Sequence, residues 1–412
     1  MGGVSDILGR TAAFAMQHAG DDCDRLLFNA SKYPDIDVPL AVDTIRGRAR
    51  MARKVPVFAA CDGLLYPGRL CVEQCSNGAC AEYKSRIASE LAPGGVVADI
   101  TGGLGVDDYF MSFNAARIHS FERDRLLARC AMYNFGLLGR KNIEVRNMDV
   151  SAGNIESLLA ELRPDLVYAD PARRSKSGGR VFAIRDYEPD IEALLPCVFA
   201  HCRYFLVKIS PMEDLDAVFN AIPQCREIHV VSHSGECKEL LLVLDRDFRE
   251  TPAACRKRVA VALGDGGEED IMAFTKEEER TVAPPFLGHA DEIMPGMSLY
   301  VPSPAILKSG AYNLFAEKSG CAKLDSSTHL YLGKAGMKPH AKAYEIIAVY
   351  PLDKKGLAAL ASRVLGRADV TARNIPLSSE DLARRLKIKT GGLHHVWGCR
   401  AAGENILLLT TS

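Results

Sequence analysis

Two short segments carry residues that could bind a nucleotide-like cofactor beside a polar acceptor. The first, Val96–Asp107, reads VVADITGGLGVD, and the second, Tyr168–Arg174, reads YADPARR. Each starts with an apolar run typical of a buried strand. Loops at the carboxyl ends of parallel strands are where open α/β sheets bind their ligands. Together the two segments predict methyl transfer from S-adenosylmethionine to a polar acceptor.

The glycine-rich loop predicts that the backbone passes close beneath a ligand. Gly102, Gly103 and Gly105 have no Cβ atom to obstruct that approach, and the helix that follows offers free N–H groups to an anion. The spacing is not Gly-x-Gly-x-x-Gly and no Lys-Ser/Thr pair follows, which argues against dinucleotide and P-loop sites. Asp99, just before the loop, is placed to accept a hydrogen bond from a methionine amino group. A tight turn without a ligand is the alternative.

Acidic residues also follow the next two predicted strands. A carboxylate at Glu122 can accept hydrogen bonds from both ribose hydroxyls, and Asp149 is placed to accept one from an adenine amino group. Capping of the next helix is the alternative for Asp149. The predicted cofactor-binding residues are Asp99, Thr101, Gly102, Gly103, Gly105, Glu122, Asp149 and Asp170.

The turn after Asp170 predicts the acceptor site. Pro171 fixes the backbone and has no N–H, so the Asp170 carboxylate can hold the hydrogens of an amine while its lone pair attacks a methyl sulfonium. Arg173 and Arg174 could clamp a phosphate or a carbonyl. Lys208 and the segment Glu236–Glu239 either line the acceptor pocket or form structural ion pairs. The predicted catalytic residues are Asp170, Pro171, Arg173 and Lys208.

Strands that alternate with helices must position these loops. The pattern predicts an α/β fold with a Rossmann-like sheet of seven strands, the last one reversed. It also predicts a helical N-terminal region and a small α+β C-terminal domain. The predicted strands are Val96–Ile100, Ile118–Phe121, Ile143–Arg146, Leu166–Ala169, Tyr204–Ile209, Glu227–Ser232 and Leu240–Leu244.

Four domains are predicted from changes in pattern and composition. Their bounds are 1–90 for the helical region, 91–245 for the sheet domain, 246–330 for a linker with a small insert, and 331–412 for a basic domain. Residues 246–285 are charged, and Gly264–Asp270 within them is predicted to be a solvent-exposed loop. A helix is expected over about 305–318, and a hairpin is expected at 394–400 and 406–411.

Charge is distributed unevenly along the 412 residues. Residues 331–400 carry 13 Lys and Arg against five Asp and Glu, although the whole chain has a net charge of −1. A basic module on an acidic body is typical of polyanion binding, and a solvated basic face is the alternative. The scattered cysteines and the missing signal-peptide pattern favour a cytoplasmic protein, and no apolar run is long enough to predict a membrane partner. The spacing of Cys61, Cys71, Cys75 and Cys80 does not predict a metal site.

The chain resembles the class I S-adenosylmethionine-dependent methyltransferases with a THUMP-like C-terminal domain. The segments that carry the resemblance are Asp99–Asp107, Asp170–Arg174, Lys208–Pro211, Glu236–Leu240, Arg373–Leu377 and Leu382–Lys387. The resemblance implies a methyltransferase domain, a ferredoxin-like insert near 280–325 and an RNA-directed C-terminal module. It also implies that Asp99, Gly103, Gly105 and Glu122 contact the cofactor, and that Asp170 and Pro171 lie at the acceptor.

Two positions depart from the family pattern. Thr101 stands where the pattern has its first glycine. Arg173 stands where enzymes with an Asn/Asp-Pro-Pro-aromatic motif place a ring that stacks on a flipped base. Tyr168, Phe182 or Tyr187 could supply a ring in its place.

The hypothesis favoured by the sequence is therefore methylation of a base in tRNA or rRNA. Three alternatives stay open: a methyltransferase for a protein or small molecule, a non-catalytic RNA-binding protein, and a nicotinamide oxidoreductase that the glycine spacing disfavours.

Overall fold

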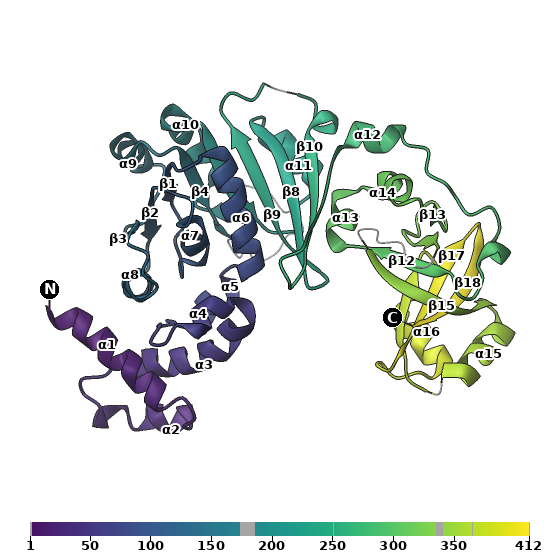
Figure 1. The fold of residues 1–412 in the computed structure, drawn as a ribbon, viewed down its shortest axis with the longest axis horizontal. Helices are drawn as coiled ribbons and strands as arrows, with labels where there is room; N and C mark the ends of the chain where they lie inside the picture. Colours follow the sequence, from purple (N-terminus) through teal and green to yellow (C-terminus); the bar gives the residue numbers. More distant parts are fainter. Residues whose placement is uncertain (1, 174–185, 250, 335–340, 365, 412) are drawn as a thin grey trace. The chain divides into compact units, whose positions relative to one another are not determined.

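The computed structural model describes residues 2–173, 186–249, 251–334, 341–364 and 366–411. The chain divides into two compact units (Figure 1). The first consists of 1–229, 238–251 and 263–267, and the second of 230–237, 252–262 and 268–412.

The sheet of the first unit brings the two predicted loops together. Its strands follow the order β8-β9-β7-β4-β1-β2-β3, with β7 and β9 antiparallel and the pairs from β7 to β3 parallel. Because β1 lies beside β4, with Asp99 opposite Tyr168, both loops leave the same edge. All seven predicted strands and the reversed last strand are present, but the sheet has nine strands, because β10 (Lys257–Leu263) and β11 (Glu269–Thr275) extend it beyond β8. Their bounds are β1 Val96–Asp99, β2 Arg117–Glu122, β3 Ile143–Asn147, β4 Leu166–Ala169, β7 Tyr204–Ile209, β8 Cys225–His233 and β9 Glu236–Asp245.

Helices connect these strands, as expected for parallel pairs. Several begin at an aspartate whose carboxylate accepts a hydrogen bond from a backbone N–H of the first turn, as Asp124, Asp190 and Asp214 do. A two-stranded ribbon of β5 (Ala172–Arg173) and β6 (Tyr187–Glu188) follows the Asp170 loop. The helices are α6 Gly78–Leu91, α7 Val106–Met111, α8 Arg125–Leu137, α9 Ile155–Leu162, α10 Ile191–His201 and α11 Leu215–Ala221.

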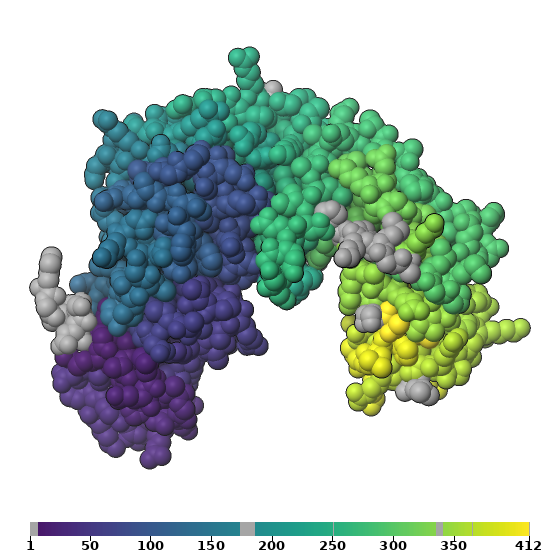
Figure 2. Space-filling view, viewed as in Figure 1, coloured from purple at the N-terminus to yellow at the C-terminus, as the bar shows by residue number. Residues whose placement is uncertain are grey.

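The predicted helical N-terminal region is confirmed, and it shares a core with the sheet domain. Met51 and Phe58 pack in one apolar cluster with Leu104 and Phe135, which belong to the glycine loop and to α8. Figure 2 shows the purple and dark-blue N-terminal segments in continuous contact with the rest of this unit. The helices are α1 Gly2–Gln17, α2 Cys23–Phe28, α3 Val38–Lys54, α4 Pro56–Ala60 and α5 Arg69–Gln74.

The second unit contains the predicted α+β C-terminal fold. Its seven-stranded sheet has the order β13-β14-β12-β15-β18-β17-β16, and β17 and β18 form the predicted hairpin. The strands are β12 Ser298–Pro302, β13 Ala322–Lys323, β14 Tyr331–Gly333, β15 Ala341–Pro351, β16 Asp369–Arg373, β17 His394–Ala401 and β18 Glu404–Thr411. The helices are α13 Pro304–Ser309, α14 Tyr312–Ser319, α15 Lys354–Val364 and α16 Ser379–Leu386.

Two local predictions concern the second half of the chain. The solvent-exposed loop predicted at Gly264–Asp270 corresponds to an exposed turn between β10 (Lys257–Leu263) and β11 (Glu269–Thr275), which α12 (Lys276–Thr281) follows. The flanking charges mask a short apolar run whose side chains are buried. The single helix expected over 305–318 is two helices, because Gly310 takes a left-handed conformation (φ 86°) that ends α13.

Candidate active site

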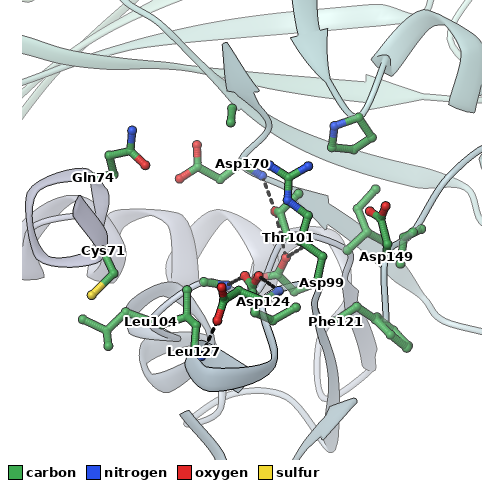
Figure 3. Close-up of a pocket in the computed structure, with 18 of the residues that line it drawn as sticks. Cys71, Gln74, Asp99, Thr101, Leu104, Phe121, Asp124, Leu127, Asp149 and Asp170 are labelled. Atoms are coloured by element: carbon green, nitrogen blue, oxygen red, sulfur yellow. Dashed lines mark hydrogen bonds between the residues drawn. The ribbon is translucent and has the colours of Figure 1, made fainter. Parts of the chain in front are cut away.

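A cavity of about 760 Å³ opens at the edge of the sheet where β1 and β4 end (Figure 3). All eight predicted cofactor-binding residues line it: Asp99, Thr101, Gly102, Gly103, Gly105, Glu122, Asp149 and Asp170. Pro171, Arg173 and Lys208 are not among its lining residues. The volume lies within the range usual for small-molecule sites.

The three loop glycines meet different constraints. A Cβ at Gly102 would lie 2.3 Å from Ser120 Oγ, and one at Gly105 would lie 2.2 Å from Phe135 Cζ. The protein's own packing therefore requires both glycines. At Gly103 (φ 58°) the only close atom is Thr101 O, at 3.6 Å. Gly103 is thus the glycine whose Cβ position is left open beside the cavity.

Thr101 joins the two loops. Its hydroxyl donates a hydrogen bond to Asp99 Oδ1 (3.1 Å) and accepts one from the backbone N–H of Asp170 (2.6 Å). The Thr101 N–H also donates to Asp99 Oδ1, at 2.7 Å. The residue that departs from the family's glycine pattern therefore ties the end of β1 to the end of β4.

Asp99 and Asp108 form a buried carboxyl pair beneath the glycine loop. Burial raises the pKa of Asp99 well above its usual range, and the neighbouring Asp108 raises it further. Burial also raises the pKa of Asp108 to about 7, against a hydrogen bond from Ser120 Oγ (2.5 Å) that lowers it. Two buried carboxyls in contact cannot both ionise easily, which is the physical reason for these raised pKa values.

Glu122 and Asp149 lie on the cavity wall in different surroundings. Glu122 is half-buried, and its two carboxylate oxygens accept hydrogen bonds from Gly103 N (2.9 Å) and Asp124 N (2.6 Å). The Glu122 side chain thereby holds the glycine loop against β2. Asp149 is exposed after β3 and lies on the same side of the cavity as Phe121 in Figure 3.

Asp170 forms an ion pair with Lys208. Lys208 Nζ lies 2.5 Å from Asp170 Oδ2. Burial lowers the pKa of Lys208, but the negative charge of Asp170 raises it, and the net pKa is above its usual value. The pair therefore holds Lys208 as a cation.

Two other predicted acceptor residues, Pro171 and Arg173, do not line the cavity. Pro171 is buried, and Arg173 is exposed on β5 opposite Tyr187. Arg174 and Phe182 lie outside the described residues.

Tyr168 and Tyr187, the two candidate rings that the structure describes, offer no face for stacking on a base. The Tyr168 ring is fully buried, and its hydroxyl donates to Asp107 Oδ2 at 2.7 Å. Tyr187 is 2% exposed, and its hydroxyl donates to Glu213 Oε1 (3.0 Å) and accepts from Ser210 N (3.0 Å). As placed in this structure, neither ring can pack against a base.

A buried charge network lies behind Asp170, and sequence reasoning missed its central residue. Lys84 on α6 is fully buried, with Nζ 2.9 Å from Asp107 Oδ1 and 3.2 Å from Glu239 Oε2. Burial lowers the pKa of Lys84, but the Asp107 and Glu239 charges raise it above its usual value overall. Glu239 is therefore part of an ion pair, one of the two alternatives that the sequence left open.

The N-terminal helices also contribute to the cavity, which the sequence did not predict. Leu70, Cys71 and Gln74 of α5 line it, together with Asp43 of α3. No motif marks these positions, and α5 is only six residues long.

Within the described residues, no helix combines the length and the apolar content needed to cross a membrane.

Comparisons with known proteins agree with this architecture. Residues 341–412 match the THUMP domain-like family, and residues 299–337 match a ferredoxin-like domain. No curated protein sequence matches the chain. A presumed methyltransferase of Porphyromonas gingivalis W83 has a crystal structure that is similar with a TM-score of 0.85 and 30% identity, over 98% of each chain.

Two other solved structures are similar over a smaller part of the chain. A presumed RNA methyltransferase of Pyrococcus horikoshii is 22% identical over 34% of this chain and 65% of its own, with a TM-score of 0.25. A presumed methyltransferase of Streptococcus mutans, solved with S-adenosylhomocysteine, is 12% identical over 40% of this chain and 96% of its own, with a TM-score of 0.29. Similarity at this level carries no conclusion about function.

Proposed function

Since the chain belongs to the class I S-adenosylmethionine-dependent methyltransferases with a THUMP-like C-terminal domain, we propose that it methylates a base in tRNA or rRNA. One observation carries the proposal. The glycine loop, the acids that end β1 and β2, Asp149 after β3, and the Asp170 loop all line the same cavity. A cofactor and an acceptor can meet there.

The cavity residues fit S-adenosylmethionine, which when bound supplies a methyl group on a positively charged sulfur. The open Cβ position at Gly103 lets the backbone approach a ligand closely. Glu122 would hold the ribose hydroxyls, and Asp149 would hold the adenine amino group. The Asp99–Asp108 pair would keep the loop in shape through Thr101.

Asp170 would hold the acceptor. Its backbone is tied to Thr101 and its carboxylate to Lys208, so its position is well defined. An ionised carboxylate beside the acceptor attracts the N–H groups of an amine and stabilises the positive charge that the amine gains on methylation. Positioning and electrostatics account for the expected catalysis, since a thioether leaves without a general acid.

The C-terminal residues support an RNA substrate. The stretch that matches the THUMP domain-like family is basic, and Arg367, Arg385 and Lys389 are exposed on it. Arg367 and Lys389 are paired by a β-bridge, so these two cations belong to one surface. Clustered cations of this kind bind the phosphate backbone.

Cofactor binding is tested by calorimetric titration with S-adenosylhomocysteine. We expect micromolar affinity for the wild type and a loss of about 10- to 100-fold for Glu122→Ala, because removing a charged hydrogen-bond partner costs roughly 1.5–3 kcal/mol. Glu156→Ala, an exposed glutamate on α9, is the matched control and should bind as the wild type does. A folded wild-type protein that does not bind would contradict the proposed function.

RNA binding is tested with the triple variant Arg367→Gln/Arg385→Gln/Lys389→Gln. Its affinity for total tRNA should fall about tenfold or more near 0.1 M salt, with a shallower salt dependence, because fewer counterions are released. Lys32→Gln/Lys141→Gln removes exposed charge from the first unit and serves as the control. Unchanged RNA affinity in the triple variant would show that these three cations do not bind the RNA. A wild-type protein that binds the cofactor but methylates no RNA would point to a protein or small-molecule acceptor.

A further inference from the structure

Helix α5 forms a second wall of the cavity that holds Asp170. Leu70 and Gln74, one helical turn apart, both line this cavity, and side chains with that spacing share a face of a helix. The glycine loop and the Asp170 loop belong to the sheet domain, whereas this wall comes from the N-terminal region. The site is therefore built from two parts of the chain that the sequence assigns to different domains.

The wall is held in place by specific contacts. Lys54 Nζ donates hydrogen bonds to the carbonyl oxygens of Val72 (3.0 Å) and Glu73 (2.6 Å) in the last turn of α5. Val72 is buried in the apolar cluster that the N-terminal helices share with α7 and α8. A short helix anchored at its end and on its inner face can present its outer side chains in a defined position.

The side of α5 that lines the cavity is apolar at Leu70 and polar at Gln74. Leu70 is 62% exposed, and Gln74 is also exposed. Figure 3 shows the amide end of Gln74 turned toward the carboxylate of Asp170. Within the described ranges no residue hydrogen bonds to the Gln74 side chain, so its donor and acceptor are available to a ligand.

We propose that Leu70 and Gln74 determine acceptor specificity by holding a planar heterocyclic base between α5 and the Asp170 loop. The proposal rests on the proposed function, since it concerns the base that is methylated. Leu70 packs against the ring, and the Gln74 amide reads the edge beside the reacting nitrogen. Asp170 only accepts hydrogen bonds, whereas the amide both donates and accepts.

Asp170 and Gln74 together select a base by the hydrogen-bonding groups along one edge of its ring. Asp170 takes an N–H of the base, and the Gln74 N–H donates to an adjacent ring nitrogen or carbonyl oxygen. Gln74→Glu keeps the shape of the side chain but removes its N–H donor. We therefore expect the Gln74→Glu variant to bind the acceptor base poorly, although the size of the side chain is unchanged.

The test measures tritiated methyl incorporation from S-adenosylmethionine into total RNA from cells that lack this gene. Gln74→Ala and Gln74→Glu are expected to lower kcat/KM for RNA by about 10- to 100-fold, the usual range for a lost base contact. Leu70→Ser should lower it several-fold. Affinity for S-adenosylhomocysteine should stay within twofold of wild type in all three, which a merely structural role of α5 would not predict.

Arg69→Ala is the matched control, because Arg69 lies on the same helix and pairs with Glu73 outside the cavity. Wild-type incorporation by both Gln74 variants would overturn the inference and leave the proposed function standing. Loss of S-adenosylhomocysteine binding in these variants would overturn it as well, since Gln74 would then hold the cofactor. No incorporation by the wild-type protein would remove the proposed function and this inference together.

Discussion

Asp170→Asn is expected to lower methyl transfer by about 100-fold or more while affinity for S-adenosylhomocysteine changes less than tenfold. The variant keeps the shape of the side chain, and the backbone N–H that donates to Thr101 is untouched. What it removes is the negative charge beside the acceptor, and loss of one preorganised electrostatic contact at a reacting centre commonly costs that much. Single-turnover methylation of RNA, with calorimetry in parallel, measures both quantities.

Two further variants distinguish the effect of the Asp170 carboxylate on activity from the effect of its ion-pair partner, Lys208. Lys208→Met removes the cation but keeps the carboxylate, so it should reduce activity less than Asp170→Asn does. Glu213→Gln, which alters the nearby contact with the Tyr187 hydroxyl, controls for general disturbance of this edge. An Asp170→Asn protein that still methylates at the wild-type rate would show that the acceptor is held elsewhere.

Lys84→Met is expected to destabilise the protein by about 3–5 kcal/mol, the usual cost of removing one partner from a buried ion pair. Its side chain is fully buried, and Asp107 and Glu239 would both lose their cation. Chemical denaturation followed by circular dichroism measures the change. If the variant unfolded with wild-type stability, the network would not contribute to the fold as these contacts imply.

The stability that Lys84→Met loses should depend on pH, in a direction that follows from the pKa values of the buried carboxyls. In the wild type, Lys84 lowers the pKa of Asp107 despite the opposing effect of burial, so this stabilisation is lost only as the pH falls through acidic values. Without Lys84 the buried carboxyls would have raised pKa values, and the folded state would bind protons that the unfolded state releases. The deficit of Lys84→Met should therefore grow as the pH rises from about 5 to 8. Lys84→Met/Glu239→Gln should recover part of it.

Much of the fold follows from local pattern, for a physical reason. Parallel strands buried on both faces need continuous apolar runs such as Leu166–Ala169, which stand out against helices with polar faces. Once β1 and β4 are adjacent and parallel, their loops must meet at one edge. The cavity around Gly103, Glu122 and Asp170 is then a consequence of strand order.

The parts that sequence reasoning missed depend on contacts between distant residues. Lys84 and Glu239 are 155 positions apart, and a lysine on a helix usually points to solvent. One local signal was present: Lys84 lies three residues after Ala81 and four before Ala88, on the apolar face of α6. A cation at such a position needs buried partners, but the sequence does not say which.

The wall formed by α5 was missed for a different reason. A six-residue helix has too few turns to show a periodicity, and Gln74 belongs to no motif. Its relevance comes only from the three-dimensional position of a helix that Lys54 holds at its end. Short elements that position a ligand are therefore the features of this protein least accessible from sequence.

The shared core of the N-terminal helices has a consequence for biosynthesis. Helix α3 leaves the ribosome before α8, the element with which its apolar residues pack, and at translation rates of about 5–20 residues per second that interval lasts several seconds. Lys84 must remain hydrated still longer, until Glu239 is made 155 residues later. The first unit can therefore complete its fold only after β9 has emerged, and until α8 has emerged its leading helices present apolar surface that chaperones can bind.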